Sequence, residues 1–83
     1  MTAIAQTSLA KLLEFLDRLD SAKVPYHLTH VRDSIMVEIA VPGERWEVEF
    51  FADCHVEFER FTGSGVVEDA NKLEALLSEY INS

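Results

Sequence analysis

Apolar and charged residues alternate most regularly between Ser34 and Glu59, where the chain reads SIMVEIAVPGERWEVEFFADCHVEFE. Alternation with a period of two is typical of a β-strand that buries one face and exposes the other. The pattern is interrupted at Pro42-Gly43-Glu44 and at Ala52-Asp53-Cys54, whose residue types are typical of turns. Because neither connection is long enough for a crossover, this stretch predicts three consecutive antiparallel strands.

The flanking residues complete the predicted fold. Tyr26 to His30 has the composition of a further strand, and Gly63-Ser64-Gly65 ends the sheet. One amphipathic helix is predicted from about Ser8 to Ala22, and a second from about Asp69 to Ile81. The apolar stripes of these helices are Leu9, Leu12, Leu13, Leu16 and Leu19 in the first and Ala70, Leu73, Leu76, Leu77 and Tyr80 in the second. We therefore expect a single α+β domain over residues 1–83, in two layers, with both helices on one face of a four-stranded antiparallel meander (α-β-β-β-β-α).

The composition is that of a small acidic protein. Fifteen Asp and Glu residues against seven Lys and Arg residues give a formal net charge of −8 over 83 residues. Binding to nucleic acid or to an anionic membrane needs clustered Lys and Arg, so we expect neither of these partners. The single cysteine excludes an internal disulfide, and no apolar run has the length of a membrane span or a leader. Together these features predict a cytoplasmic protein.

The register of the strands is predicted by asking which residues must share a face. The predicted pairs are Val41–Trp46, Ile39–Val48, Ala40–Glu47 and Glu38–Glu49 in the middle hairpin, Phe50–Val56, Glu49–Glu57 and Glu47–Glu59 in the last, and His27–Glu38 and Thr29–Met36 in the first. The core face then comprises Leu28, Ile35, Val37, Ile39, Trp46, Val48, Phe50, Val56 and Phe58. The open face comprises three rows: His27, Glu38, Glu49 and Glu57; Ala40, Glu47 and Glu59; and Thr29, Met36, Phe51 and His55.

This open face admits three interpretations, which the sequence leaves open. It is a solvated surface on a structural homo-oligomer, where negative charge maintains solubility. Alternatively, it binds a basic protein or a second copy of the chain, with carboxylates for steering and apolar side chains as anchors. In the third interpretation it is a divalent-metal or hydrolytic site. The residues of the binding surface are Met36, Glu38, Glu47, Glu49, Phe51, Glu57 and Glu59, and those of the metal site are His27, Glu38, Glu49 and Glu57.

No motif for catalysis accompanies these carboxylates. Cys54 and His55 are neighbours in the sequence, but their side chains are expected to diverge across the pleat. Gly63-Ser64-Gly65 lacks the Gly-Lys-Ser/Thr residues that complete a phosphate-binding loop. An open sheet also lacks the concave pocket that catalysis usually needs. We therefore expect a protein that is not an enzyme, uses no cofactor and works by binding.

Residues Pro42 to Phe61 read PGERWEVEFFADCHVEFERF, and this hairpin resembles small acidic bacterial proteins of uncharacterised function. The resemblance leads us to expect Asp-Gly at the turn, where this chain has Cys54 after Asp53. The last residue of such a loop is usually left-handed and favours Gly, so Cys54 predicts local strain. The resemblance implies a bacterial cytosolic origin and assigns no catalytic residue. In size and charge the chain is also similar to bacterial immunity proteins that neutralise toxins, although no sequence motif is shared with them.

Overall fold

The computed structural model describes residues 7–62 and 73–81. Its elements are α1 (Ser8–Ser21), β1 (Tyr26–Val31), β2 (Ser34–Val41), β3 (Glu44–Phe51), β4 (Val56–Phe61) and α2 (Leu73–Ile81). The predictions made for Gly63-Ser64-Gly65, for Ala70, for the helix start near Asp69 and for the side chain of Tyr80 lie outside what is described.

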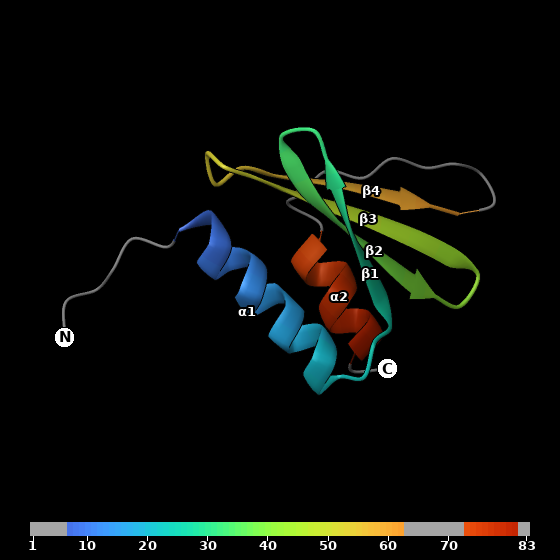
Figure 1. The fold of residues 1–83 in the computed structure, drawn as a ribbon. Coiled ribbons are helices and arrows are strands. Elements are labelled where there is room, and N and C mark those ends of the chain that lie inside the picture. Colours follow the sequence, from blue (N-terminus) through green and yellow to red (C-terminus); the bar gives the residue numbers. More distant parts are fainter. Residues whose placement is uncertain (1–6, 63–72, 82–83) are drawn as a thin grey trace, which may run out of the picture.

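The four strands form one antiparallel sheet in the order β1-β2-β3-β4, as the alternating pattern predicts. Both helices lie against the same face of this sheet, so the fold has two layers (Figure 1). Helix α1 begins after Thr7, whose hydroxyl accepts a hydrogen bond from the N–H of Ala10 at 3.0 Å. The predicted α+β architecture is confirmed.

The core lies between the helices and the sheet. Its buried apolar side chains are Phe15, Leu19, Val24, Val37, Ile39, Val41, Trp46, Val48, Phe50, Phe58, Leu73 and Leu77. The ring centroid of Phe15 on α1 lies 5.4 Å from that of Phe50 on β3, and Trp46 meets Phe58 edge to face at 5.7 Å. Trp46 is therefore a core residue, as its place in the alternation predicts.

The side of α1 that enters this core differs from the predicted stripe. Phe15 and Leu19 are buried, whereas Leu9 and Leu13 are 62% and 52% exposed. At about 100° per residue, Leu13 lies two positions from Phe15 and so on nearly the opposite side of the helix. The large ring of Phe15 packs against Phe50 and turns its own side of α1 toward the sheet. The prediction that Leu9 and Leu13 belong to the core is wrong.

Strand β1 is an edge strand and is less buried than predicted. Leu28 is 51% exposed, although its partner Val37 on β2 is fully buried. Helix α2 lies beside α1, where Arg18 forms an ion pair with Glu74, and α1 packs through Phe15 on Phe50 of β3. The described part of the helices leaves the edge uncovered, so the prediction that Leu28 is buried is wrong.

The register between β2 and β3 is shifted by two residues from the predicted one. Val41 pairs with Glu44 and Ile39 pairs with Trp46, so the connection is the two-residue turn Pro42-Gly43. Gly43 has φ +77°, the conformation required of the third residue of a type II turn, and Pro favours the position before it. Because this turn connects β2 to β3 through only two residues, it excludes the four-residue loop that the predicted Val41–Trp46 pair requires. A shift of two keeps every side chain on its predicted face, because the side-chain period of a strand is two.

The other two registers are as predicted. Strand β1 pairs His27 with Glu38 and Thr29 with Met36. Strands β3 and β4 pair Glu49 with Glu57, and Cys54 at the end of their loop has φ +71°. This value is left-handed, a conformation that glycine adopts more easily than cysteine, so the predicted strain at the turn is present.

Candidate functional site

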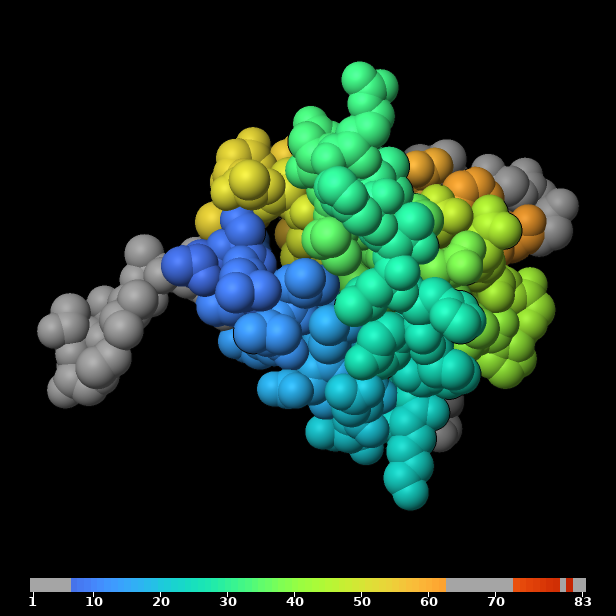
Figure 2. Space-filling model, viewed as in Figure 1, coloured from blue at the N-terminus to red at the C-terminus, as the bar shows by residue number. Residues whose placement is uncertain are grey.

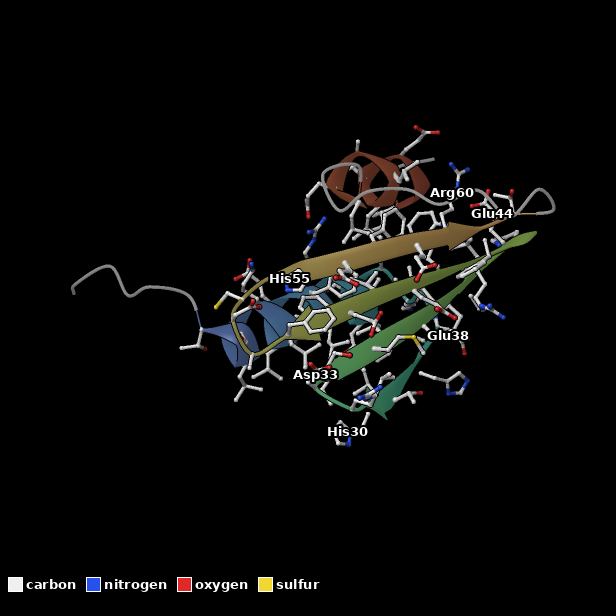
Figure 3. The ribbon with its side chains drawn as sticks, turned by 90° about the horizontal axis from the view of Figure 1, so that it is seen from above. His30, Asp33, Glu38, Glu44, His55 and Arg60 are labelled. Atoms are coloured by element: carbon white, nitrogen blue, oxygen red, sulfur yellow. The ribbon has the colours of Figure 1, made fainter. Side chains whose placement is uncertain are left out.

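The open face of the sheet, which points away from both helices, gathers five carboxylates in two adjacent rows. The first row across the strands is His27, Glu38, Glu47 and Glu59, and the second is Thr29, Met36, Glu49 and Glu57. We call the five carboxylates Glu38, Glu47, Glu49, Glu57 and Glu59 the acidic face. All five share one face, as the alternation predicts, and Figure 3 labels Glu38 among them on β2.

The corrected register separates the residues of the predicted metal site. His27 and Glu38 stand in the first row, whereas Glu49 and Glu57 stand in the second. Glu38 therefore faces Glu47 instead of Glu49. Within residues 7–62 and 73–81 no three His, Cys, Asp or Glu side chains are spaced to hold a metal ion. The prediction that these four residues form a single row across the sheet is therefore wrong.

Glu47 lies at the centre of the acidic face. Its side chain is only 20% exposed, and it stands directly between Glu38 and Glu59 on the neighbouring strands. Burial raises the pKa of Glu47 above its usual value, and the nearby carboxylates, Glu59 foremost, raise it further. Arg45 opposes this shift. Like charges placed opposite one another on neighbouring strands destabilise a sheet, so the acidic face carries an electrostatic cost.

Arg45 is the cation that lies against this cluster. Its Nε is 3.4 Å from a carboxylate oxygen of Glu38 and 3.3 Å from one of Glu47. The guanidinium carbon also lies 4.7 Å from the ring centroid of Phe61, so Arg45 contacts an aromatic side chain of β4 as well. One guanidinium shared between two carboxylates leaves a net negative charge on the first row. The predicted register does not place Arg45 beside Glu38. The observed register does, because it pairs Arg45 with Ala40 on β2, and Phe61 lies opposite Arg45 on β4.

The second row is held by hydrogen bonds at the opposite end of the sheet. The buried hydroxyl of Ser34 donates to Glu49 at 2.8 Å. The ring of His55 stacks on Phe51 with centroids 4.3 Å apart, and its Nε2 lies 2.8 Å from a carboxylate oxygen of Glu57. Phe51, a predicted anchor for a partner, is therefore covered on one side by His55.

His55 is held by two carboxylates. Its Nδ1 lies 3.1 Å from Asp53 and its Nε2 lies 2.8 Å from Glu57. Glu57 contributes most to raising the pKa of His55, burial opposes the shift, and Asp53 adds to it. The sulfur of Cys54 is instead 3.3 Å from the hydroxyl of Ser8 on α1. Cys54 and His55 thus make separate contacts, as expected from the pleat.

A second charged cluster lies at the rim of the core, at the β2–β3 turn. Arg60 donates through Nε and Nη2 to the carboxylate of Glu44 at 2.7 and 3.0 Å, and Trp46 Nε1 donates to the same carboxylate at 2.8 Å. These hydrogen bonds lower the pKa of Glu44 to about 2. Figure 3 shows Glu44 and Arg60 together at one end of the sheet and His55 at the other. The sequence signal for this cluster is the i, i+2 spacing of Glu44 and Trp46, because residues two apart in a strand lie on the same face.

Comparisons with known proteins leave these residues without an assigned role. No protein-family model, curated protein or solved structure matches the chain. The resemblance of residues 42–61 to small acidic bacterial proteins therefore stays a prediction. Among the described residues, neither helix has the length and apolar character needed to cross a membrane.

Proposed function

We propose that this chain is a non-enzymatic interaction module that binds a basic segment of a protein partner through the acidic face. The observation that carries the proposal is the pair of adjoining carboxylate rows around Glu47, on the side of the sheet that the helices leave open. Binding of this kind would neutralise a basic protein by covering its cationic surface. The proposal also places the protein in the cytoplasm, since a single cysteine suits a reducing compartment.

The electrostatics of the acidic face favour a cationic ligand. Two unit charges at 4 Å interact by about 1 kcal/mol in water and by more where water is partly excluded. Glu47 faces Glu38 on one side and Glu59 on the other, and Glu49 faces Glu57. A Lys or Arg side chain of a partner placed between two such carboxylates would replace repulsion by attraction. The same field accelerates encounter with a basic protein, and salt weakens this effect.

Met36 provides an apolar contact within the second row. It lies between Thr29 and Glu49, and its side chain is only partly buried. A flexible thioether adapts to the aliphatic stem of a Lys or Arg side chain. Phe51 is a weaker anchor than predicted, because His55 stacks on it. The proposed surface is therefore centred on Met36 and Glu47.

A binding role is favoured over a catalytic one by the state of His55. Both of its ring nitrogens lie within 3.1 Å of carboxylate oxygens, which occupies the atoms that a general base would use. The acidic face also presents its carboxylates on the broad outer surface of the sheet, whereas catalysis needs reacting groups held in a pocket away from water.

The proposal is tested with two double variants that each remove two negative charges. Glu47→Gln with Glu59→Gln removes them from the acidic face, and Asp17→Asn with Asp33→Asn removes them from α1 and the β1–β2 turn. Each protein is passed over an immobilised deca-lysine peptide and eluted with increasing salt. We expect the acidic-face variant to elute at lower salt than the wild type and the control to elute near the wild type. Equal elution of the two variants would mean that only net charge matters and that the acidic face is a solvated surface.

A further inference from the structure

The exposed edge of the sheet at β1 has features that set it apart from the acidic face. Strand β1 reads YHLTHV and carries no Asp or Glu, in a chain whose net charge is −8. Its four middle residues are exposed, and Leu28 among them is 51% exposed. Figure 2 shows β1, in teal and green, along the viewed face beside α1, in blue. An edge strand of this kind is a template for pairing with another strand.

The hydrogen-bonding groups at this edge follow from the pairing with β2. The N–H of Ala40 donates to the carbonyl of Pro25 at 3.3 Å. Residues of an antiparallel strand bond alternately to one side and the other, so His27 and Thr29 direct their backbone groups toward β2. Leu28 therefore directs its N–H and C=O outward, away from the sheet. Within the described part of the chain no strand pairs with β1 on that side.

Charges of both signs lie at each end of β1, with Asp20 and Lys23 before the strand and Arg32 and Asp33 after it. At the beginning, the hydroxyl of Tyr26 donates to the carboxylate of Asp20 at 2.9 Å. At the other end, Nε2 of His30 lies 2.8 Å from the carbonyl oxygen of Arg32, and the exposed residues Arg32 and Asp33 form the turn to β2. An antiparallel copy of the same strand would bring Asp20 and Lys23 of one chain toward Arg32 and Asp33 of the other, so that each carboxylate has a cation of the other chain on its side, twice over. A parallel copy would instead align each of these charges with the same charge of the other chain.

We propose that a second copy of this chain pairs antiparallel with β1 about a two-fold axis at Leu28. In this register Leu28 lies opposite Leu28 of the second copy, and His30 lies opposite Tyr26 of the second copy. The paired strands join two four-stranded sheets into one continuous sheet, and the exposed leucines at the axis bury each other. This pairing is isologous, so each copy contributes the same surface.

The neighbouring surface supports this choice of occupant. A groove of about 370 Å³ lies between α1 and the β1–β2 turn, and Leu9, Leu12, His30 and Ile35 are among the residues that line it. It adjoins His30, where Tyr26 of the second copy arrives, so it offers an apolar surface next to the new strand. The pairing leaves the acidic face free, because backbone hydrogen bonds at the edge do not use the open face. The inference is therefore independent of the proposed function.

The first experiment measures the mass of the chain by light scattering over a concentration series. We expect the wild type to form a dimer and Leu28→Lys to be a monomer, because the charge would lie at the two-fold axis. Ala75→Lys on the exposed side of α2 adds the same charge away from β1 and is expected to remain a dimer. A wild type that is monomeric throughout, or a control that dissociates like Leu28→Lys, overturns the proposal. Thermal melting checks that each variant is folded.

The second experiment tests the register by oxidation in a Cys54→Ser background, which removes the native thiol. Hydrogen-bonded antiparallel partners have Cα atoms about 5.5 Å apart, within the range of a disulfide. We expect Leu28→Cys to form a covalent dimer, whereas Thr29→Cys, which lies opposite His27 of the second copy, does not. Cross-linking at Thr29→Cys alone, or at neither position, overturns the register centred on Leu28.

Discussion

From the ion pair between Glu44 and Arg60 we predict how the stability of the fold changes with pH. We expect Glu44→Gln to destabilise the fold near neutral pH, because the carboxylate accepts hydrogen bonds from Arg60 Nε at 2.7 Å and from Trp46 Nε1 at 2.8 Å. The substitution keeps the shape of the side chain and removes its charge. It therefore weakens the charge-assisted bonds that join the β2–β3 turn to β4.

The magnitude follows from the pKa. That of Glu44 is lowered from 4.5 to about 2, and at about 1.36 kcal/mol per pKa unit this corresponds to at most about 3 kcal/mol. The side chains of Glu44 and Arg60 are 24% and 27% exposed, so solvent screens part of the interaction. We therefore expect a loss of about 1–2 kcal/mol. Because the pKa is lower in the folded state, the stabilisation is complete above the unfolded value of 4.5 and is lost as the pH falls toward 2.

The assay is urea unfolding of wild type and Glu44→Gln, followed by fluorescence of Trp46, from about pH 7 to about pH 2.5. The difference in unfolding free energy is expected to shrink as the pH falls, because protonation removes the same charge from the wild type. Asp33→Asn, which removes a carboxylate from the exposed β1–β2 turn, serves as the control and is expected to show almost no difference. A difference for Glu44→Gln that is absent at neutral pH, or unchanged down to pH 2.5, would refute the assignment.

Four further predictions concern the core, the turn and the acidic face. Trp46→Ala is expected to cost about 3–5 kcal/mol, enough to unfold much of a small domain, and an unchanged melting curve would contradict its place in the core. Cys54→Gly is expected to raise stability by about 1 kcal/mol in urea unfolding, since φ +71° suits glycine; a loss would show that the contact of Cys54 with Ser8 outweighs the strain. Glu47→Gln is expected to raise the melting temperature at neutral pH, and the gain should shrink in acid because the pKa of Glu47 is raised in the fold. Calorimetric titration of Mn²⁺ or Zn²⁺ is expected to show no saturable binding, and tight binding lost in Glu49→Gln would support the metal interpretation instead.

The architecture was predictable from the alternation of the strands and from the spacing of apolar residues in the helices. The period of two between Ser34 and Glu59 assigned the five carboxylates to one face and Trp46 to the other, and both assignments hold. This information is local, since adjacent residues of a strand must point to opposite faces whatever the strand pairs with. The left-handed turn at Cys54 was predictable for the same reason, because the length of a hairpin loop limits its backbone conformations.

The order of residues across the strands was not predictable from alternation. Any slip by two residues preserves both faces, so the apolar pattern accepts Val41–Trp46 and Ile39–Trp46 equally well. Closure of the tight turn at Pro42-Gly43 selected the second pairing. That selection placed Arg45 beside Glu38 and separated the residues of the predicted metal site. The chemistry of the open face thus depended on one turn.

The depth of burial along α1 and β1 also needed the assembled fold. Leu13 has the helical spacing of a core residue, and Leu28 has the parity of one, yet both are about half exposed. Periodicity reports which side of an element is apolar, but not how far a neighbouring layer extends over it. Phe15 packs against Phe50 on β3, and the described part of the helices leaves the edge at β1 open. Local pattern determines the faces of this protein, and packing between layers determines which part of each face meets water.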